Sequence, residues 1–116
     1  METLTLRTET PPFRTEASIR IGNSCVNLRS GAAQNPSGAH RLRRKELELL
    51  AFLYQHTGAV FSRDELLRRV WNYQGGVLTR TVDQTVATLR RKLNDGSAKR
   101  KHLVTVYGIG YRLQPS

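Results

Sequence analysis

The stretch RTVDQTVATLRRKL, residues 80–93, decides the fold because it sets apolar and basic residues on opposite sides of one helix. At about 100° per residue, its apolar side chains share one narrow sector: Val82, Val86, Leu89 and Leu93. The opposite sector holds Gln84, Ala87, Thr88 and Arg91, with Thr85, Arg90 and Lys92 at its flanks. The spacing predicts a helix over about 80–94 with Thr79 or Thr81 as its N-cap.

The sequence before this helix carries the signals of two shorter helices. An apolar repeat at positions i, i+3, i+4 and i+7 predicts a helix over about 44–56 that buries Leu47, Leu50, Ala51 and Tyr54. In SRDE, residues 62–65, the Ser62 hydroxyl can accept from the Glu65 amide while the Glu65 carboxylate reaches back, which is a capping box. The helix that follows, over about 63–71, buries Leu66, Leu67, Val70 and Trp71.

Short β-type runs lie at both ends of the chain. SIRIG and CVNLRSG, separated by Gly22-Asn23, predict a small antiparallel sheet from Ser18 onward. The run LVTVYGIGYRL, residues 103–113, predicts a hairpin that turns between Tyr107 and Gly110. We expect GAAQNPSGAH, residues 31–40, to form a mobile loop, and RLRR after it to be a possible last strand.

Length and composition indicate one domain. The chain has 116 residues, and residues 1–17, with several threonines and Pro11-Pro12, are expected to form a flexible tail or interdomain linker before a domain over 18–116. A net charge of +10 favours a polyanionic partner, either nucleic acid or an anionic membrane surface. Apolar runs are too short to span a bilayer and no signal peptide is visible, so we expect no membrane partner and a cytoplasmic protein.

The sequence contains no constellation typical of catalysis or metal binding. His40, His56 and His102 are scattered, and Gly108-Ile109-Gly110 is too short to cradle a phosphate. The single cysteine, Cys25, is expected to be a small core or strand residue. We therefore expect no enzymatic activity, no metal and no cofactor.

DNA recognition needs cations for phosphates and a slender element whose polar side chains reach base edges. The helix over 80–94 offers Gln84, Thr85, Thr88 and Arg91 for base edges or backbone. Arg80 and Thr81 lie at its N-terminus, where free amides also favour an anion. A lone basic helix more often has a merely solvated face, but the hairpin and the basic segment 99–101 favour DNA binding.

From about Arg43 to Leu113 the chain resembles the winged-helix effector domain of the OmpR/PhoB family of bacterial response regulators. SRDELLRRVW, RTVDQTVATLRRKL and VTVYGIGYRL match three successive motifs of that family in order and spacing. The resemblance implies an α+β fold, a winged helix-turn-helix with an N-terminal small antiparallel sheet, three helices and a C-terminal β-hairpin wing. It further implies a sequence-specific, double-stranded DNA-binding transcription regulator, the output domain of a two-component system.

The same resemblance implies roles for individual residues. The third helix would lie in the major groove and the wing in the adjacent minor groove, while the loop between Trp71 and Arg80 would face RNA polymerase. Phosphate contacts would come from Arg80, Thr81, Thr85, Arg90, Trp71 and Tyr111, and base contacts from Gln84 and Thr88. Trp71 and Tyr111 fit equally well as core residues.

Two positions depart from the family pattern. Many relatives have an arginine or another long polar residue where this chain has Ala87 and Thr88, so its base-reading surface is smaller. Tyr107 occupies the wing-tip position where some members insert arginine into the minor groove. A tyrosine there can stack on a sugar or bond a phosphate, but it lacks the positive charge.

Two questions stay open at this point. A receiver domain normally precedes this effector, so the chain is either an excised output domain or a free-standing regulator. As an output domain it would bind direct-repeat half-sites as a head-to-tail dimer after receiver phosphorylation. The alternative function is a protein-interaction module that contacts RNA polymerase or a receiver domain through Tyr73, Val77 and Leu78. RNA binding is less expected, because no set of surface aromatics suits unpaired bases.

Overall fold

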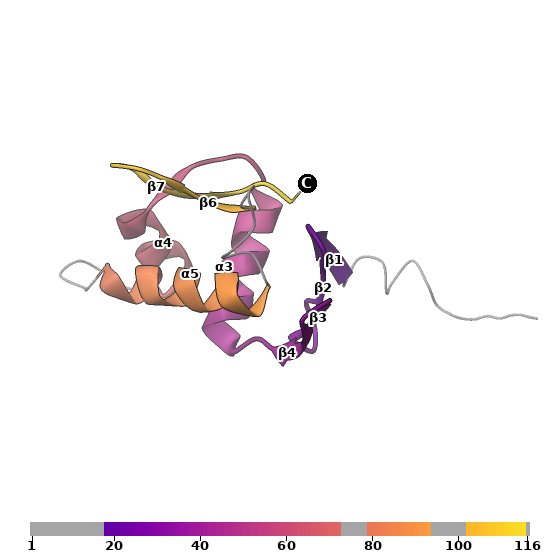
Figure 1. The fold of residues 1–116 in the computed structure, drawn as a ribbon. Helices are drawn as coiled ribbons and strands as arrows, with labels where there is room; N and C mark the ends of the chain where they lie inside the picture. The colour runs from indigo at the N-terminus through magenta and orange to yellow at the C-terminus, as the bar shows by residue number, and fades with distance from the viewer. Residues whose placement is uncertain (1–17, 73–78, 94–101, 116) are drawn as a thin grey trace, which may run out of the picture.

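The computed structural model describes residues 18–72, 79–93 and 102–115, and the predicted architecture is confirmed (Figure 1). The elements, in chain order, are β1 (Ser18–Ile21), β2 (Ser24–Asn27), β3 (Ala32–Asn35), β4 (Gly38–Arg41), α3 (Arg44–Gln55), β5 (Phe61–Ser62), α4 (Arg63–Val70), α5 (Arg80–Lys92), β6 (Leu103–Val106) and β7 (Gly110–Leu113). The predicted tail at 1–17 lies outside the described residues.

The N-terminal sheet has the order β1-β2-β3-β4, with every neighbouring pair antiparallel. The prediction of a loop over residues 31–40 was wrong, because β3 and β4 pair there and are joined by a turn at residues 36–37. The Asn35 side chain holds this turn, since its Oδ1 accepts from the Ser37 amide at 2.9 Å. These strands were not predicted because the residue that they bury in the core is the small Ala33 and not a β-branched residue typical of strands.

Helix α3 buries Leu50 as predicted, but the rest of its buried face differs from the prediction. Its buried residues are Glu46, Leu49, Leu50 and Leu53, whereas Leu47 and Ala51 are half-buried and Tyr54 is exposed. The stripe is displaced because the Glu46 carboxylate faces inward and accepts from the Arg43 amide at 2.9 Å and the Lys92 ammonium at 2.8 Å. An apolar repeat cannot reveal a buried acid whose partner is distant in sequence.

The predictions are confirmed for the buried stripe of α5, for Leu66, Leu67 and Val70 in α4, and for the capping box of α4, whereas Trp71 is only half-buried. Ser62 Oγ accepts from the Glu65 amide at 3.1 Å, and Glu65 Oε1 accepts from the Ser62 amide at 3.1 Å. The predicted side-chain cap of α5 was wrong. The N-cap residue Thr79 has φ −61° and ψ −16° and makes no capping hydrogen bond, while Thr81 lies inside the helix. A side-chain cap requires an extended backbone at the N-cap residue, whereas the backbone of Thr79 is already helical, so its hydroxyl does not reach the first amides of α5.

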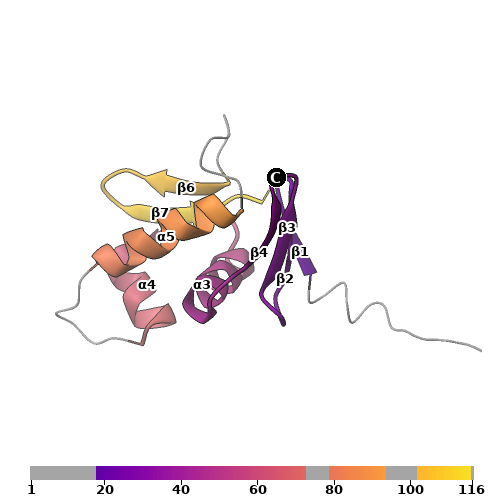
Figure 2. The ribbon, with the colours of Figure 1, turned by 60° about the horizontal axis from the view of Figure 1, so that its bottom comes forward.

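The three helices pack around one core, and two sheets border them (Figure 2). The N-terminal sheet stands beside α3, and the second sheet, of order β5-β7-β6, carries the C-terminal hairpin next to α5. Gly22 N donates to Pro115 O at 3.0 Å, which joins the first sheet to the end of the chain. Cys25 lies on β2 as predicted, but its side chain is exposed and does not join the core.

Replacing Gly110 by alanine is expected to destabilise the hairpin severely. A Cβ at this position would lie 1.9 Å from the Phe61 carbonyl oxygen, because β5 and β7 pass at backbone contact distance. We expect Gly110→Ala to lower the free energy of unfolding by about 3 kcal/mol, measured by urea denaturation. Gly108→Ala is the matched control: φ there is +80° but the space is open, so only about 1 kcal/mol is expected. Equal losses would contradict the close approach.

Candidate nucleic-acid interface

The side of α5 opposite its core stripe forms one exposed ridge. Arg80, Gln84, Ala87 and Arg91 are exposed along it, at successive spacings of four, three and four residues. Thr81 and Thr88 lie beside the ridge and are half-buried. The predicted polar face therefore exists, and the small Ala87 at its centre lets a flat ligand approach the helix backbone.

The basic residues of α5 divide into two pairs. Arg80 and Arg91 project from the ridge, and neither makes an ion pair with the described part of the chain. Arg90 instead turns inward, where its Nη2 donates to Leu103 O at 2.8 Å and to Thr105 Oγ1 at 2.7 Å. Lys92 bonds Glu46 Oε1 at 2.8 Å and Arg41 O at 2.9 Å. Half of the cations on this helix thus hold the protein together.

The hairpin is fastened to the first turn of α5 through Asp83. Its Oδ1 accepts from the Tyr111 hydroxyl at 2.6 Å and pairs with Arg63 Nε at 3.0 Å. The Arg90 guanidinium lies 5.8 Å from the centre of the Tyr111 ring. Burial raises the pKa of the Tyr111 phenol, and the hydrogen bond and charge of Asp83 raise it further, against a lowering by Arg63. Tyr111 therefore fixes the angle between wing and helix.

The remaining predicted contacts occupy different surroundings. Trp71, the C-cap of α4, is half-buried and packs against the core. Thr85 donates its hydroxyl proton to Thr81 O at 2.9 Å, within the helix. Tyr107 is 89% exposed at the wing tip, which lies toward the same end of the molecule as the N-terminus of α5 (Figures 1 and 2).

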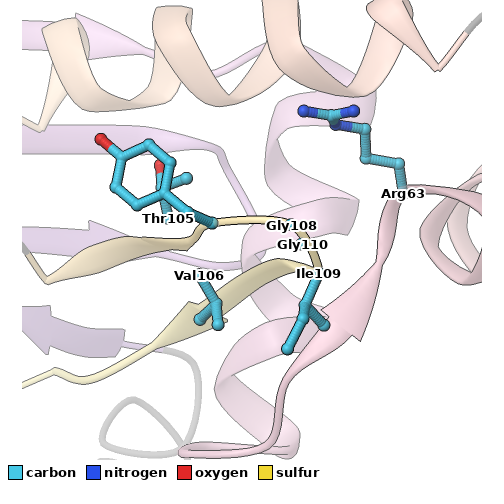
Figure 3. A pocket seen from close by; sticks show the side chains of 7 residues that line it. Arg63, Thr105, Val106, Gly108, Ile109 and Gly110 are labelled. Atoms are coloured by element: carbon cyan, nitrogen blue, oxygen red, sulfur yellow. The ribbon is translucent and has the colours of Figure 1, made fainter.

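Two further residues at the wing were missed by sequence reasoning. A hollow of about 210 Å³ beneath the hairpin is lined by Arg63 and residues 105–110. Figure 3 shows the Arg63 side chain on the α5 side of the hairpin, with Val106 and Ile109 on its other side. Ile109 is 59% exposed. Two signals in the sequence could have found these residues. Ile109 lies between two glycines, and Arg63 places a positive charge at the start of α4.

Several predictions concern residues that the structure does not describe. The basic segment at 99–101 and the apolar residues Tyr73, Val77 and Leu78 lie outside the described ranges. In the described part of the chain, no group of three or more His, Cys, Asp or Glu side chains is placed to hold a metal ion. No helix of that part has the length and apolar character needed to cross a membrane.

The Tyr111–Asp83 hydrogen bond predicts a pH-dependent stability difference. A raised folded-state pKa means that the protonated phenol stabilises the fold below about pH 10, and that this contribution is lost as pH rises through the folded-state pKa. Tyr111→Phe is expected to lower the free energy of unfolding by about 1–3 kcal/mol at pH 7, with a smaller difference above pH 10. Urea denaturation from pH 7 to 11 measures it, with Tyr54→Phe as control. A gap that stays constant would speak against this role for Tyr111.

Comparison with known proteins places this geometry in a family. Residues 37–113 match the family described as "Transcriptional regulatory protein, C terminal". The alkaline phosphatase synthesis transcriptional regulatory protein PhoP of Bacillus subtilis (strain 168) is 42% identical over 73 residues, which cover 63% of this chain and 30% of that protein. The matched stretch therefore spans less than a third of the length of that relative.

Solved structures agree over a longer stretch that includes the first sheet. The DNA-binding domain of Escherichia coli CadC has a TM-score of 0.71 and 30% identity, covering 86% of this chain and 94% of that one. The DNA-binding domain of the response regulator AdeR, solved in complex with an intercistronic region, has a TM-score of 0.63 and 26% identity, covering 84% and 100%. This chain belongs to the transcriptional regulatory protein, C-terminal family, with the winged-helix fold of response-regulator DNA-binding domains.

Proposed function

We propose that this domain binds specific sequences of double-stranded DNA as the output domain of a two-component response regulator, with α5 in the major groove and the wing at the adjacent minor groove. The observation that carries the proposal is the exposed ridge along α5, formed by Arg80, Gln84, Ala87 and Arg91. Its two arginines have no ion-pair partner in the described part of the chain, and the whole chain has a net charge of +10. A major groove about 12 Å wide admits one helix, and a ridge of this kind suits its floor and edges.

Each ridge residue has a distinct proposed task. Arg80 binds a phosphate with help from the positive N-terminal end of the helix dipole. Gln84 and Thr88 meet base edges, and Arg91 meets base or backbone at the far end. Further residues border the phosphates: Thr81, Thr85, Trp71 and Tyr111. Arg90 does so as well, but its hydrogen bonds to the wing limit it to a supporting contact. Tyr107 approaches the minor groove from the wing tip.

The remaining assignments extend the proposal to the whole regulator. Because the match to PhoP covers only 30% of that protein, the proposal extends to a receiver domain, to head-to-tail dimerisation on direct repeats and to contact with RNA polymerase through the loop between Trp71 and Arg80. We expect the regulator to act in the bacterial cytoplasm, without a catalytic step or cofactor. The protein-interaction alternative is not favoured, since the structural neighbours include a DNA-binding domain bound to an intercistronic region.

Selection from random duplex DNA is the primary test. The purified chain, at about 150 mM salt where nonspecific attraction is weakened, is expected to enrich a defined motif. Two copies of that motif about 10 base pairs apart would indicate head-to-tail dimers. Selection is repeated with the chain fused to a dimerising domain, because one half-site alone binds weakly. Absence of enrichment in both formats would overturn sequence-specific binding.

Substitutions on the ridge are expected to separate phosphate contacts from base contacts. Arg80→Ala should weaken binding to every duplex and reduce the slope of log affinity against log salt by about 1. Gln84→Ala or Thr88→Ala should instead change preference at one base position, by about 10-fold or more. Fluorescence anisotropy over a salt series measures both effects. Arg20→Ala, an equal charge loss at an exposed position of β1, is the control; the same slope change in both arginine variants would contradict the assignment.

A further inference from the structure

The C-terminal end of α5 is held by side chains of the N-terminal sheet. Ser24 Oγ donates to Leu93 O at 2.7 Å, and Asn35 Nδ2 donates to Lys92 O at 2.9 Å. Asn35 Nδ2 also reaches Ser24 Oγ at 3.1 Å, so the two side chains form one connected cap. The last carbonyls of a helix have no partner within it, and here strands from early in the chain supply the donors.

The sheet geometry explains why these two residues meet. Ser24 begins β2 and Asn35 ends β3, and the pairing of Cys25 with Gln34 sets them side by side at one end of the sheet. Ser24 is fully buried. Asn35 Oδ1 accepts from the amide and hydroxyl of Ser37 at 2.9 and 2.5 Å, which directs Nδ2 toward the helix. The side-chain amide of Asn35 is therefore held at its oxygen by Ser37 and at its nitrogen by Lys92 O and Ser24 Oγ.

Leu93 is the C-cap of helix α5, with φ −88° and ψ 3°, and its amide donates to Leu89 O at 2.8 Å. The next position, where a left-handed residue commonly closes a helix, lies outside the described residues. A third tie comes from Lys92, whose ammonium bonds Glu46 Oε1 on α3 and the backbone carbonyl of Arg41 at the end of β4. The final turn of α5 thus depends on the sheet and on α3 for its position.

The final turn also carries Arg91, the last cation of the exposed ridge. We propose that Asn35 and Ser24 are positioning residues for DNA binding: they hold the last turn of α5 so that Arg91 is presented at a fixed distance from Arg80. The two arginines are eleven positions apart in the sequence, which is about 16 Å along the helix. Fraying of the last turn releases Arg91 while leaving Arg80 in place. This role presupposes the DNA binding proposed above.

The sharpest variant is Asn35→Asp, which keeps Oδ1 as the acceptor for Ser37 but removes both N–H donors to the helix end. It also sets a negative charge beside the C-terminal carbonyls, where the helix dipole disfavours it. Ser37→Ala is the matched control, because it removes a hydroxyl from the same turn while the Ser37 amide still holds Asn35 Oδ1 and both Nδ2 donors remain. Ser24→Ala removes the hydroxyl that donates to Leu93 O and adds no charge. It replaces Asn35→Asp in the experiment if that variant does not fold.

Hydrogen exchange and DNA binding together test the role. We expect Asn35→Asp to reduce protection of the Leu93 amide, which donates to Leu89 O at 2.8 Å, by about 10-fold, with α4 unchanged. Affinity for the selected duplex should fall about 5- to 10-fold, and Arg91→Ala should then cause little further loss. Arg80→Ala should keep its full effect in that background. This selective coupling is the readout that a general loss of stability would not produce.

The outcomes separate the two proposals. Unchanged protection of Leu93, or unchanged affinity despite lost protection, overturns the positioning role while DNA binding stands. Equal coupling of Asn35→Asp to Arg80→Ala and Arg91→Ala also overturns it, because the effect is then global. A wild-type chain that binds no duplex at all overturns the proposed function first, and the positioning role with it.

Discussion

The burial of one stripe of α5 governs what the rest of this domain can present. Val82, Val86, Leu89 and Leu93 are each at most 4% exposed, and burying a side chain of this size contributes about 1.5–3 kcal/mol. A hydrogen bond at the surface contributes about 1 kcal/mol. The core therefore fixes the rotation of α5 about its axis, and the outward residues can be chosen for recognition without altering the fold.

Rotation alone does not orient a recognition surface, because the helix must also be fixed at both ends and relative to the wing. Asp83 in the first turn binds Tyr111 of β7 and Arg63 of α4, which joins three elements at one carboxylate. The cap from Asn35 and Ser24 secures the other end. Between them, Arg90 bridges the helix to β6. These polar ties convert a packed helix into one with a defined position against the hairpin.

Elements specified by local sequence were predictable, and those specified by distant partners were not. The capping box at Ser62, the stripe of α5 and the hairpin turn all depend on residues a few positions apart. The face of α3 was misassigned because Glu46 is buried by Lys92, which follows it by 46 positions. Likewise, the strands at 32–41 are held by pairing and by α5 rather than by β-branched residues.

The same distinction applies to the interface and changes how its charge is understood. The sequence grouped Arg90 with Arg80 and Arg91, yet only contacts with Leu103 and Thr105 reveal that its guanidinium faces the protein. The described cations of the ridge are thus at its two ends, with Gln84 and Ala87 between them. In the proposed complex, the two separated cations would meet phosphates on either side of a groove, and the short Ala87 would let the backbone of α5 approach the bases. Because the wing carries a tyrosine and not a cation at position 107, the proposed binding mode would leave discrimination between sequences chiefly to the middle of α5.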